Sequence, residues 1–518
     1  MDLKLTEADV QAIVDRVMAN IERRLGTAGA GTAAAGAAAD RPAPAAGNPA
    51  AGPASAAAPA ASPRPEYGVF ERAEDAVAAA AEAQEAFARQ CRLADRERIV
   101  QAIREATLAH KEELARLIWE ETKLGRLEHK IAKLELTARK TPGTEDLRPE
   151  AFSGDDGLTI VEHAPYGVIG AVTPVTNPAE TIINNAIGML ASGNAVVFNV
   201  HPSAKRCSAR AVQMINKAVI TAGGPPNLVT MVREPTMETL DVIIRSPSVK
   251  LLVGTGGPGL VNALLRSGKK AIGAGAGNPP VVVDETADLE HAAREIIKGA
   301  SFDNNILCIA EKEVFVVNRA ADGLIYHMLD NGAYMLGRDE LEKVMQFALT
   351  RAEGRGSAGC SIDPRRAWRV AKEWVGKDAR LFLDQIGVRT DRPVELLLCE
   401  VDFDHPFVQL EQMMPVLPIV RVRDLDEAIE LAVRAEHGNR HTALMHSRNV
   451  DNLTRFARAI GTTIFVKNAS SLAGVGYGGE GFTTMTIAGP TGEGLTSART
   501  FTRKVRCVLA DGGFRIVG

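Results

Sequence analysis

One cysteine lies where an α/β chain could carry a nucleophile. Cys308 falls in Ser301–Glu313 (SFDNNILCIAEKE), between a predicted helix, Leu289–Ala300, and a predicted strand, Glu313–Val317. Loops that connect such elements often carry reactive groups, and a thiolate there can form a covalent intermediate. Spacing alone leaves the opposite interpretation open, because a lone cysteine among apolar neighbours is usually a small core residue. The sequence places no histidine beside Cys308 to act as its base.

Two glycine-rich turns have the composition of a phosphate-binding site. Val249–Gly259 (VKLLVGTGGPG) is predicted to be a strand that runs into glycines, followed by a helix over Leu260–Arg266. Ala271–Pro280 (AIGAGAGNPP) follows closely and introduces the next strand. Backbone N–H groups at a helix N-terminus bind phosphate well. The spacing departs from the common dinucleotide fingerprint, and a plain strand-to-helix turn also uses glycine. Two such turns so close together favour a nucleotide site.

The elements that must position these groups alternate between strand and helix from about Thr159 onward. This alternation predicts an α/β fold with largely parallel sheets. The helical and charged stretch from Tyr67 to about Lys140 precedes it, and Thr500–Val508 is predicted to be a final strand. The other predicted strands are Val168–Val172, Ala195–Phe198, Leu228–Val232, Leu251–Val253 and Pro280–Val283, and the predicted helices include Thr181–Ala191 and Ala204–Ala222.

The N-terminal residues form a separate pattern. Apolar residues recur at helical spacing within Met1–Leu25 and predict an amphipathic helix. Residues 26–65 are dominated by Ala, Gly and Pro, a composition typical of a disordered linker. A lone helix of this length needs a surface to cover its apolar stripe. It could dock on its own protein or a sister subunit, or it could be a docking peptide for another protein, which the long linker favours.

Composition excludes several classes of protein. The 518 residues are enough for two or three domains. The chain carries 60 Lys and Arg against 64 Asp and Glu, a net charge of −4, so nothing indicates a nucleic-acid partner. The six cysteines form no CxxC pair, so we expect no metal site and a reducing compartment. The polar N-terminus does not resemble a secretory signal, and no apolar run of membrane-spanning length occurs, so we expect a cytoplasmic protein.

Together these motifs resemble the aldehyde dehydrogenase superfamily over about Tyr67–Gly518. Within it, the chain resembles the CoA-acylating aldehyde dehydrogenases of bacterial microcompartments, which act on propionaldehyde or acetaldehyde. The matching segments, in order, are Val168–Lys205, Leu251–Gly259, Ala271–Asp284, Asn304–Glu313 and Leu410–Val420. The resemblance implies an α/β fold of two Rossmann-like domains with a small oligomerisation strand element and a disordered N-terminal extension.

The resemblance also implies how the chain is divided and what it assembles with. A homo-oligomer, dimer or tetramer, is expected. Residues 1–25 would be a targeting helix that binds a microcompartment shell protein, which places the enzyme in the lumen. The remaining divisions are a linker over 26–65, an NAD-binding domain over 66–275 with 141–162 contributing to oligomerisation, a catalytic domain over 276–466, and a return to the cofactor domain with an oligomerisation tail over 467–518.

Site residues follow from the same resemblance. Cys308 matches the family's nucleophile. Thr173–Asn177 match the loop that approaches the substrate carbonyl, where Thr176 or Asn177 would complete an oxyanion hole with the Cys308 backbone N–H. Asn199–Pro202 replaces a lysine motif of hydrolytic relatives, and NAD is expected rather than NADP. The implied cofactor-binding residues are Thr173, Pro174, Asn199, His201, Pro202, Gly254, Thr255, Gly256, Gly275 and Glu411, with Glu411 on the nicotinamide ribose.

One departure from the hydrolytic relatives indicates how the acyl group leaves. Those enzymes carry a glutamate just before a Gly–Gly pair, and it activates the attacking water. Here Gly273–Gly277 reads GAGAG and contains no carboxylate. An acyl thioester on Cys308 would lack a general base for hydrolysis, whereas the thiol of coenzyme A needs less help. We therefore expect oxidation of a short aliphatic aldehyde, propionaldehyde in the first place, to its acyl-CoA. The alternatives are a hydrolytic enzyme that releases the free acid and a non-catalytic shell-associated protein.

Overall fold

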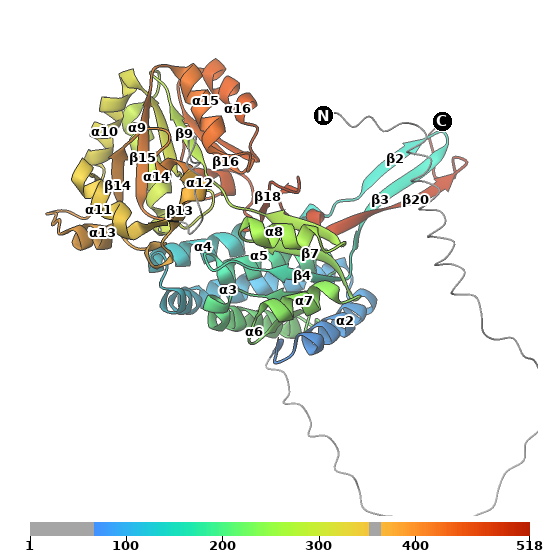
Figure 1. Cartoon of the computed structure of the whole chain (residues 1–518). Coiled ribbons are helices and arrows are strands. Elements are labelled where there is room, and N and C mark those ends of the chain that lie inside the picture. Colours follow the sequence, from blue (N-terminus) through green and yellow to red (C-terminus); the bar gives the residue numbers. More distant parts are fainter. Residues whose placement is uncertain (1–66, 352–363, 518) are drawn as a thin grey trace, which may run out of the picture. The chain divides into compact units, whose positions relative to one another are not determined.

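A computed structural model describes residues 67–351 and 364–517 of the chain. The predicted targeting helix over 1–25 and the predicted linker over 26–65 lie outside these residues. Arg64–Gly518 forms one compact unit. It contains two large sheets and a three-stranded one, together with two strand pairs (Figure 1). Within the described residues, no helix has the length and apolar content needed to cross a bilayer.

The first large sheet is parallel throughout, in the order β1-β6-β5-β4-β7-β8. The chain passes through β4, β5 and β6 in one direction and then returns to place β7 beside β4. The strand order therefore reverses between β4 and β7, and the carboxyl ends of strands at such a reversal are where open α/β sheets bind ligands. The strands are β1 (Val69–Phe70), β4 (Val168–Val172), β5 (Ala195–Asn199), β6 (Val229–Val232), β7 (Val249–Thr255) and β8 (Lys270–Ala274).

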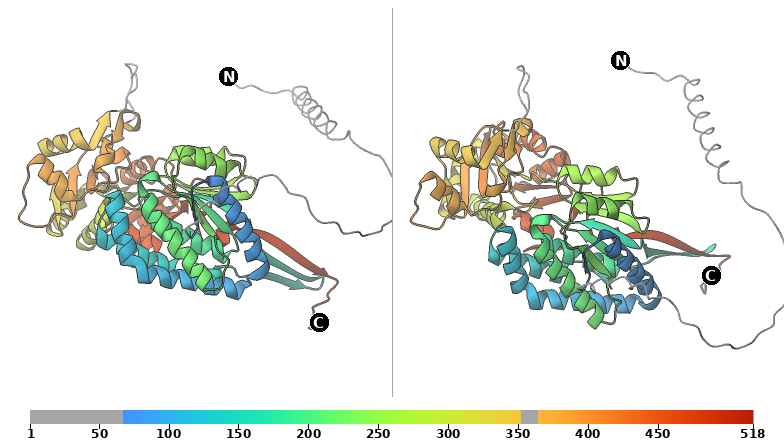
Figure 2. Two further views of the ribbon diagram at one scale, coloured as in Figure 1. Left: turned by 90° about the horizontal axis from the view of Figure 1, so that it is seen from below. Right: turned by 60° about the horizontal axis from the view of Figure 1, so that its bottom comes forward.

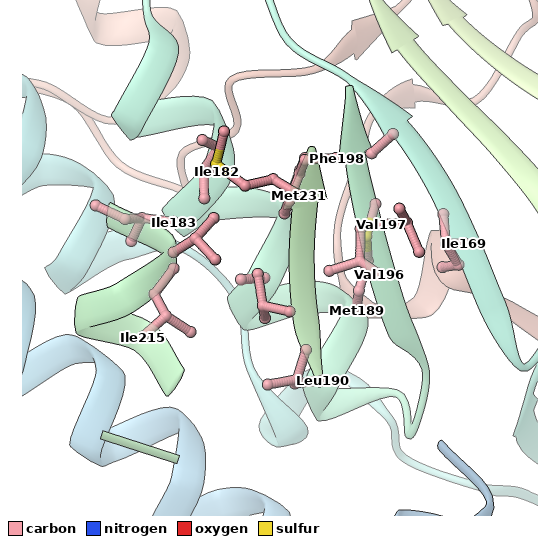
Figure 3. Close-up of a cluster of buried hydrophobic side chains, with 14 of the residues drawn as sticks. Ile169, Ile182, Ile183, Met189, Leu190, Val196, Val197, Phe198, Ile215 and Met231 are labelled. Carbon is pink, nitrogen blue, oxygen red and sulfur yellow. The ribbon is translucent and has the colours of Figure 1, made fainter. Parts of the chain in front are cut away.

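Helices cover both faces of this sheet. The helix pair α5 and α6 packs over one face and the pair α2 and α7 over the other, as right-handed crossovers require. Every residue of α5 is buried, and Figure 3 shows its Ile182 and Leu190 in the same apolar cluster as Phe198 of β5. The helices are α2 (Ala73–Gln90), α3 (Leu93–Thr122), α4 (Leu127–Lys140), α5 (Pro178–Ala191), α6 (Lys205–Thr221), α7 (Met237–Arg245) and α8 (Pro258–Leu265).

The second large sheet is also parallel, in the order β11-β14-β15-β10-β9-β16-β17. Val281 and Val283 pack in one apolar cluster and Val282 in another, so both faces of β9 are buried. This explains the nearly continuous apolar runs of strands such as β9 and β10. The strands are β9 (Pro280–Val283), β10 (Glu313–Val317), β11 (Ala333–Met335), β14 (Leu396–Glu400), β15 (Val416–Val422), β16 (Thr442–His446) and β17 (Ile464–Lys467).

Helices α9 and α10 pack together beside this sheet, and α15 and α16 form a second pair. The helices of this region are α9 (Leu289–Ser301), α10 (Asn318–Asp330), α11 (Arg338–Ala348), α12 (Pro364–Ala367), α13 (Ala379–Ile386), α14 (Pro406–Gln409), α15 (Leu425–Ala435) and α16 (Val450–Ile460). Two short antiparallel pairs complete the strands, β12 (Leu349–Arg351) with β13 (Trp368–Val370) and β18 (Ile487–Ala488) with β19 (Gly494–Leu495).

The third sheet is antiparallel and consists of β2 (Glu150–Gly154), β3 (Gly157–Pro165) and β20 (Thr502–Ala510). It extends away from the two large sheets (Figure 2). The predicted tail strand over Thr500–Val508 corresponds to β20, which pairs with β3 along its whole length. Phe152 and Val508 are exposed on this sheet.

The predicted α/β fold with largely parallel sheets is confirmed. The predicted boundary at residue 275 falls between β8 and β9, and the one at residue 466 falls inside β17. The contacts join the described residues of Arg64–Gly518 in one unit. The domain divisions therefore stay predictions.

Candidate active site

Four loops converge at the amino edge of the second sheet. Cys308 precedes β10, Gly277 precedes β9, Glu411 precedes β15 and His441 immediately precedes β16. These four strands are consecutive neighbours in the order β15-β10-β9-β16. Because the strands are parallel, the segments that enter them meet at one edge of the sheet. The topology thus gathers residues that lie far apart in the sequence.

Gly277 fits closely against the Cys308 loop. A Cβ atom at residue 277 would lie 2.4 Å from the carbonyl oxygen of Cys308 and 3.1 Å from the ring of His441. The Gly277 N–H donates to Glu411 Oε1 at 3.1 Å. The close approach requires glycine here, and the same residue orients the Glu411 carboxylate.

We expect Gly277→Ala to reduce kcat by about 10²-fold, because the added methyl group displaces the Cys308 loop and misplacements of about 1 Å have effects of this size. Steady-state NADH formation measures the loss. Gly154→Ala is the matched control, since a Cβ atom there would meet nothing within 4 Å. Unchanged kcat in Gly277→Ala would contradict the close approach.

The backbone before Cys308 has an unusual conformation. Asp303, Asn304 and Asn305 all have left-handed φ values of 51°, 54° and 66°. Asp and Asn tolerate this region better than other residues with side chains, and such strain concentrates at functional sites. The Asn305 Nδ2 group donates to the carbonyl oxygens of Ala300 at 2.8 Å and Glu311 at 2.9 Å, which holds the turn closed. The polar residues flanking Cys308 therefore shape its loop.

Lys312 supports the same loop from inside the protein. Its fully buried Nζ donates to the backbone oxygen of Asn305 at 2.8 Å, to Asn305 Oδ1 at 2.6 Å and to the carbonyl oxygen of Leu307 at 3.0 Å. Burial lowers the pKa of Lys312 to about 8, although the nearby Glu411 favours its ammonium form. A positive charge thus lies beneath the turn that carries Cys308.

The Cys308 thiol is held protonated by its surroundings. Burial, together with the Glu411 carboxylate, raises the pKa of Cys308 to about 12, and Lys312 opposes both. Burial also raises the pKa of Glu411 to about 7, against Lys312 and the N–H of Gly277. Without cofactor, the nucleophile is therefore a neutral thiol at pH 7, beside a carboxyl group that titrates in that range.

We expect alkylation of Cys308 by iodoacetamide, without cofactor, to accelerate about tenfold per pH unit between about pH 7 and pH 9, because only the thiolate reacts and its fraction rises in this way below the pKa. Mass spectrometry of the peptide containing Cys308 gives the rate. A plateau within this pH range would show that the thiol ionises near neutrality, which contradicts a pKa of about 12.

Cys308 and Asn177 line the same small cavity. Its volume is about 40 Å³. Asn177 lies at the N-terminus of α5, directly before Pro178, and its side chain is buried. The other lining residues are Lys133, Leu136, Phe302, Leu307, Ile309, Leu472, Val475, Tyr477, Thr484, Met485 and Ile487. The structure thus brings the predicted nucleophile together with one of the two predicted oxyanion donors.

The predicted cofactor residues, apart from Glu411, lie at or just beyond the carboxyl ends of neighbouring strands of the first sheet. Thr173 follows β4, and its buried Oγ1 has no hydrogen-bond partner among the described residues. An orphaned hydroxyl beside the β4–β7 reversal fits a polar ligand there. The remaining members are Pro174 after β4, Asn199, His201 and Pro202 at the end of β5, Gly254, Thr255 and Gly256 at the end of β7, and Gly275 after β8.

Some of these groups are already engaged within the protein. Asn199 Oδ1 accepts from Thr239 Oγ1 at 2.7 Å, and Asn199 Nδ2 donates to the carbonyl oxygen of Thr236 at 3.3 Å. The N–H of Gly256 donates to the carbonyl oxygen of Ala274 at 3.0 Å. A Cβ atom at Gly254 would lie 2.2 Å from the side chain of Leu264. These contacts maintain the shape of the loops, and contact of the three residues with a cofactor stays a prediction.

The sequence does not mark Lys133, Lys312 or His441 as site residues, although their side chains are buried near Cys308. Lys312 lies inside the segment Asn304–Glu313. Lys133 is on α4, where only its i,i+3 spacing from Lys130 marks a common face. His441 is buried, its Nε2 has no partner among the described residues, and burial lowers its pKa to about 4. Lys133 and His441 come from distant segments, so periodicity could not connect them with Cys308.

Comparison with known proteins identifies the family. The profile of the aldehyde dehydrogenase family matches residues 66–483. Acetaldehyde dehydrogenase (acetylating) EutE of Salmonella typhimurium is 50% identical over 453 residues, 87% of this chain and 94% of the relative. Propanal dehydrogenase (CoA-propanoylating) of Citrobacter freundii is 46% identical over 448 residues, 86% and 93% of the two chains. The structure of Rhodopseudomonas palustris propionaldehyde dehydrogenase with bound CoA and an acylated cysteine is 50% identical, with a TM-score of 0.82 over 86% of this chain and 99% of that one. The chain belongs to the aldehyde dehydrogenase family.

Proposed function

We propose that this protein is a CoA-acylating aldehyde dehydrogenase that oxidises a short aliphatic aldehyde, propionaldehyde in the first place, with NAD. The observation that carries the proposal is the pairing of Cys308 with Asn177 in a cavity of about 40 Å³. The absence of a carboxylate from Gly273–Gly277 directs the acyl group to CoA rather than to water. The relatives named for acetylating and CoA-propanoylating activities support the same assignment.

The reaction begins with addition of the Cys308 sulfur to the aldehyde carbon, as the thiol proton passes to solvent. The Cys308 backbone N–H and a side-chain donor hold the resulting oxyanion. Hydride then leaves that carbon for the nicotinamide ring, and the acyl group stays on Cys308 as a thioester. Attack by the CoA thiolate breaks this thioester and forms acyl-CoA, and the released Cys308 thiolate takes up the proton that CoA lost, which restores the thiol. One aldehyde, one NAD and one CoA thus give one acyl-CoA, one NADH and one proton.

Asn177 supplies the side-chain donor in this proposal, rather than Thr176. The amide of Asn177 lines the cavity that contains Cys308. The only acceptor near its Nδ2 among the described residues is Thr176 Oγ1, at 3.5 Å, which is at the limit of a hydrogen bond. The N–H groups of Asn177 therefore keep their capacity to bind a developing negative charge.

NAD fits the carboxyl edge of the first sheet, where it would accept the hydride. Thr173 Oγ1 offers an unsatisfied hydroxyl at that edge. A Cβ atom at Gly257 would meet nothing within 4 Å, so the turn after β7 has open space on that side. Glu411 is placed beside Cys308 by its contact with Gly277 and would bind the nicotinamide ribose.

We also propose how copies of the chain assemble and where the enzyme is located. The exposed apolar side chains of the three-stranded sheet, Phe152 and Val508 among them, support pairing with a second copy of the chain. We propose that the amphipathic helix predicted over residues 1–25 binds a shell protein and so places the enzyme inside a bacterial microcompartment. A structure of one relative comes from the fucose utilisation microcompartment of Clostridium phytofermentans.

Product analysis tests the proposed reaction directly. The purified protein is incubated with propionaldehyde and NAD, with or without CoA, and the products are separated by chromatography. Propionyl-CoA in amounts equal to NADH is the expected result. Propionate formed at the same rate with and without CoA would establish the hydrolytic alternative, and no product in either case would favour the non-catalytic one.

A further inference from the structure

Two buried lysines lie one helical turn apart on α4, behind the active site. Lys130 and Lys133 are 0% and 2% exposed. Both bind Asp303 Oδ2, Lys130 at 2.9 Å and Lys133 at 2.7 Å, and Lys133 also lies 3.1 Å from Glu180 Oε1. Two cations and two carboxylates thus form a charge-balanced cluster. Asp303 belongs to the left-handed turn that leads to Cys308.

Of these two lysines, only Lys133 also contacts the Thr173–Asn177 loop, which carries the oxyanion donor. Lys133 Nζ donates to Asn177 Oδ1 at 2.6 Å and to the carbonyl oxygen of Thr176 at 3.4 Å. An ammonium group only donates hydrogen bonds, so the Asn177 amide must present its oxygen to Lys133. The NH₂ group of the same amide then faces away from Lys133. Lys133 and Asn177 both line the cavity that contains Cys308.

We propose that Lys133 is a positioning residue for the oxidation step, which fixes the Asn177 amide with its N–H groups toward the reacting carbonyl and ties it through Asp303 to the Cys308 loop. One ammonium group then sets the relative position of the nucleophile and the oxyanion donor. If the amide could turn over, its oxygen would face the developing negative charge and the stabilisation would be lost.

The charges of the cluster keep Lys133 able to do this. Burial disfavours its ammonium form, but Asp303 and Glu180 outweigh burial and raise the pKa of Lys133. Burial likewise disfavours the Asp303 carboxylate, but Lys133 and Lys130 lower the pKa of Asp303 to about 2. The bond between Lys133 and Asn177 Oδ1 is therefore charge-assisted and persists across the neutral pH range.

A double-mutant cycle tests the proposal, with Lys130→Met as the matched control. Lys133→Met, Lys130→Met and Asn177→Ala are made singly and in pairs, and kcat and KM are measured with propionaldehyde, NAD and CoA. We expect Lys133→Met and Asn177→Ala each to lower kcat by about 10²-fold. We expect the pair to be no worse than Asn177→Ala alone, because both changes remove the same interaction. The effect of Lys130→Met should multiply with that of Asn177→Ala.

Three results would overturn the proposal. They are unchanged kcat in Lys133→Met, effects of Lys133→Met and Asn177→Ala that multiply, and equal coupling of Lys130→Met to Asn177→Ala. If Lys133→Met does not fold, Lys133→Met/Glu180→Gln replaces it, because this double variant removes one cation and one anion and leaves Lys130 paired with Asp303. Lys133 acts in this way only within the proposed acylating reaction. Failure of that reaction would appear as an inactive wild-type protein, whereas failure of the positioning role would appear as an active wild type without coupling.

Discussion

Replacing Cys308 with alanine is expected to reduce NADH formation from propionaldehyde, NAD and CoA by about 10⁴-fold or more. Removal of a covalent nucleophile has effects of this size in enzymes that form acyl intermediates. The alanine leaves Asn177 and the cofactor residues in place, but no atom remains to form the thioester. Absorbance of NADH under saturating substrates measures the change.

Two controls separate loss of chemistry from loss of structure. Cys507 is exposed on β20, so Cys507→Ala should keep full activity. The affinity of Cys308→Ala for NAD, measured by calorimetry, should equal that of the wild type, because the nucleophile contributes little to cofactor binding. Residual activity of Cys308→Ala above about one per cent of the wild-type rate would assign the nucleophile to another group.

The strands of the large sheets could be predicted closely because their sequences are strongly patterned. Val168–Val172 and Pro280–Val283 are short apolar runs between turn residues, and the observed β4 and β9 have the same bounds. The last strand shifted by two residues, from Thr500–Val508 to Thr502–Ala510. Residues Ala498–Phe501 instead form a 3₁₀ turn, and the N–H of Ser497 donates to Thr500 Oγ1 at 3.0 Å. Local side-chain capping of this kind competes with strand formation.

The site could be predicted only where one segment carries the chemistry. Cys308 and its polar neighbours are contiguous, so a motif identifies them. The contact of Lys130 with Asp303 spans 173 residues, and that of Gly277 with Glu411 spans 134. Such pairs are created by the order β15-β10-β9-β16 and by the packing of α4 near the Cys308 turn. Sequence spacing reveals neither the strand order nor this packing, so the places of Lys133 and His441 beside Cys308 became visible only in the folded chain.

Without CoA, we expect a burst of NADH equal to one molecule per Cys308, followed by a rate at least about 10²-fold lower than with CoA. General bases accelerate attack by water by about 10² to 10⁴, and Gly273–Gly277 offers none. The acyl group therefore stays bound to Cys308 until a thiol attacks the thioester. Stopped-flow measurement of NADH absorbance gives the burst, and mass spectrometry of the protein should show the added propionyl group.

The structure places a different carboxyl group, that of Glu411, near the sulfur that would carry the thioester. Glu411 contacts Gly277, and burial raises the pKa of Glu411 to about 7, a value suitable for a general base. If the wild type turns over steadily without CoA and Glu411→Gln shows only the burst, Glu411 activates water and the enzyme is hydrolytic despite the glycine-rich turn. If both proteins stop after the burst, the hydrogen bond from the Gly277 N–H keeps the Glu411 carboxylate from activating water. In that case the fate of the acyl group is decided by the missing carboxylate in Gly273–Gly277.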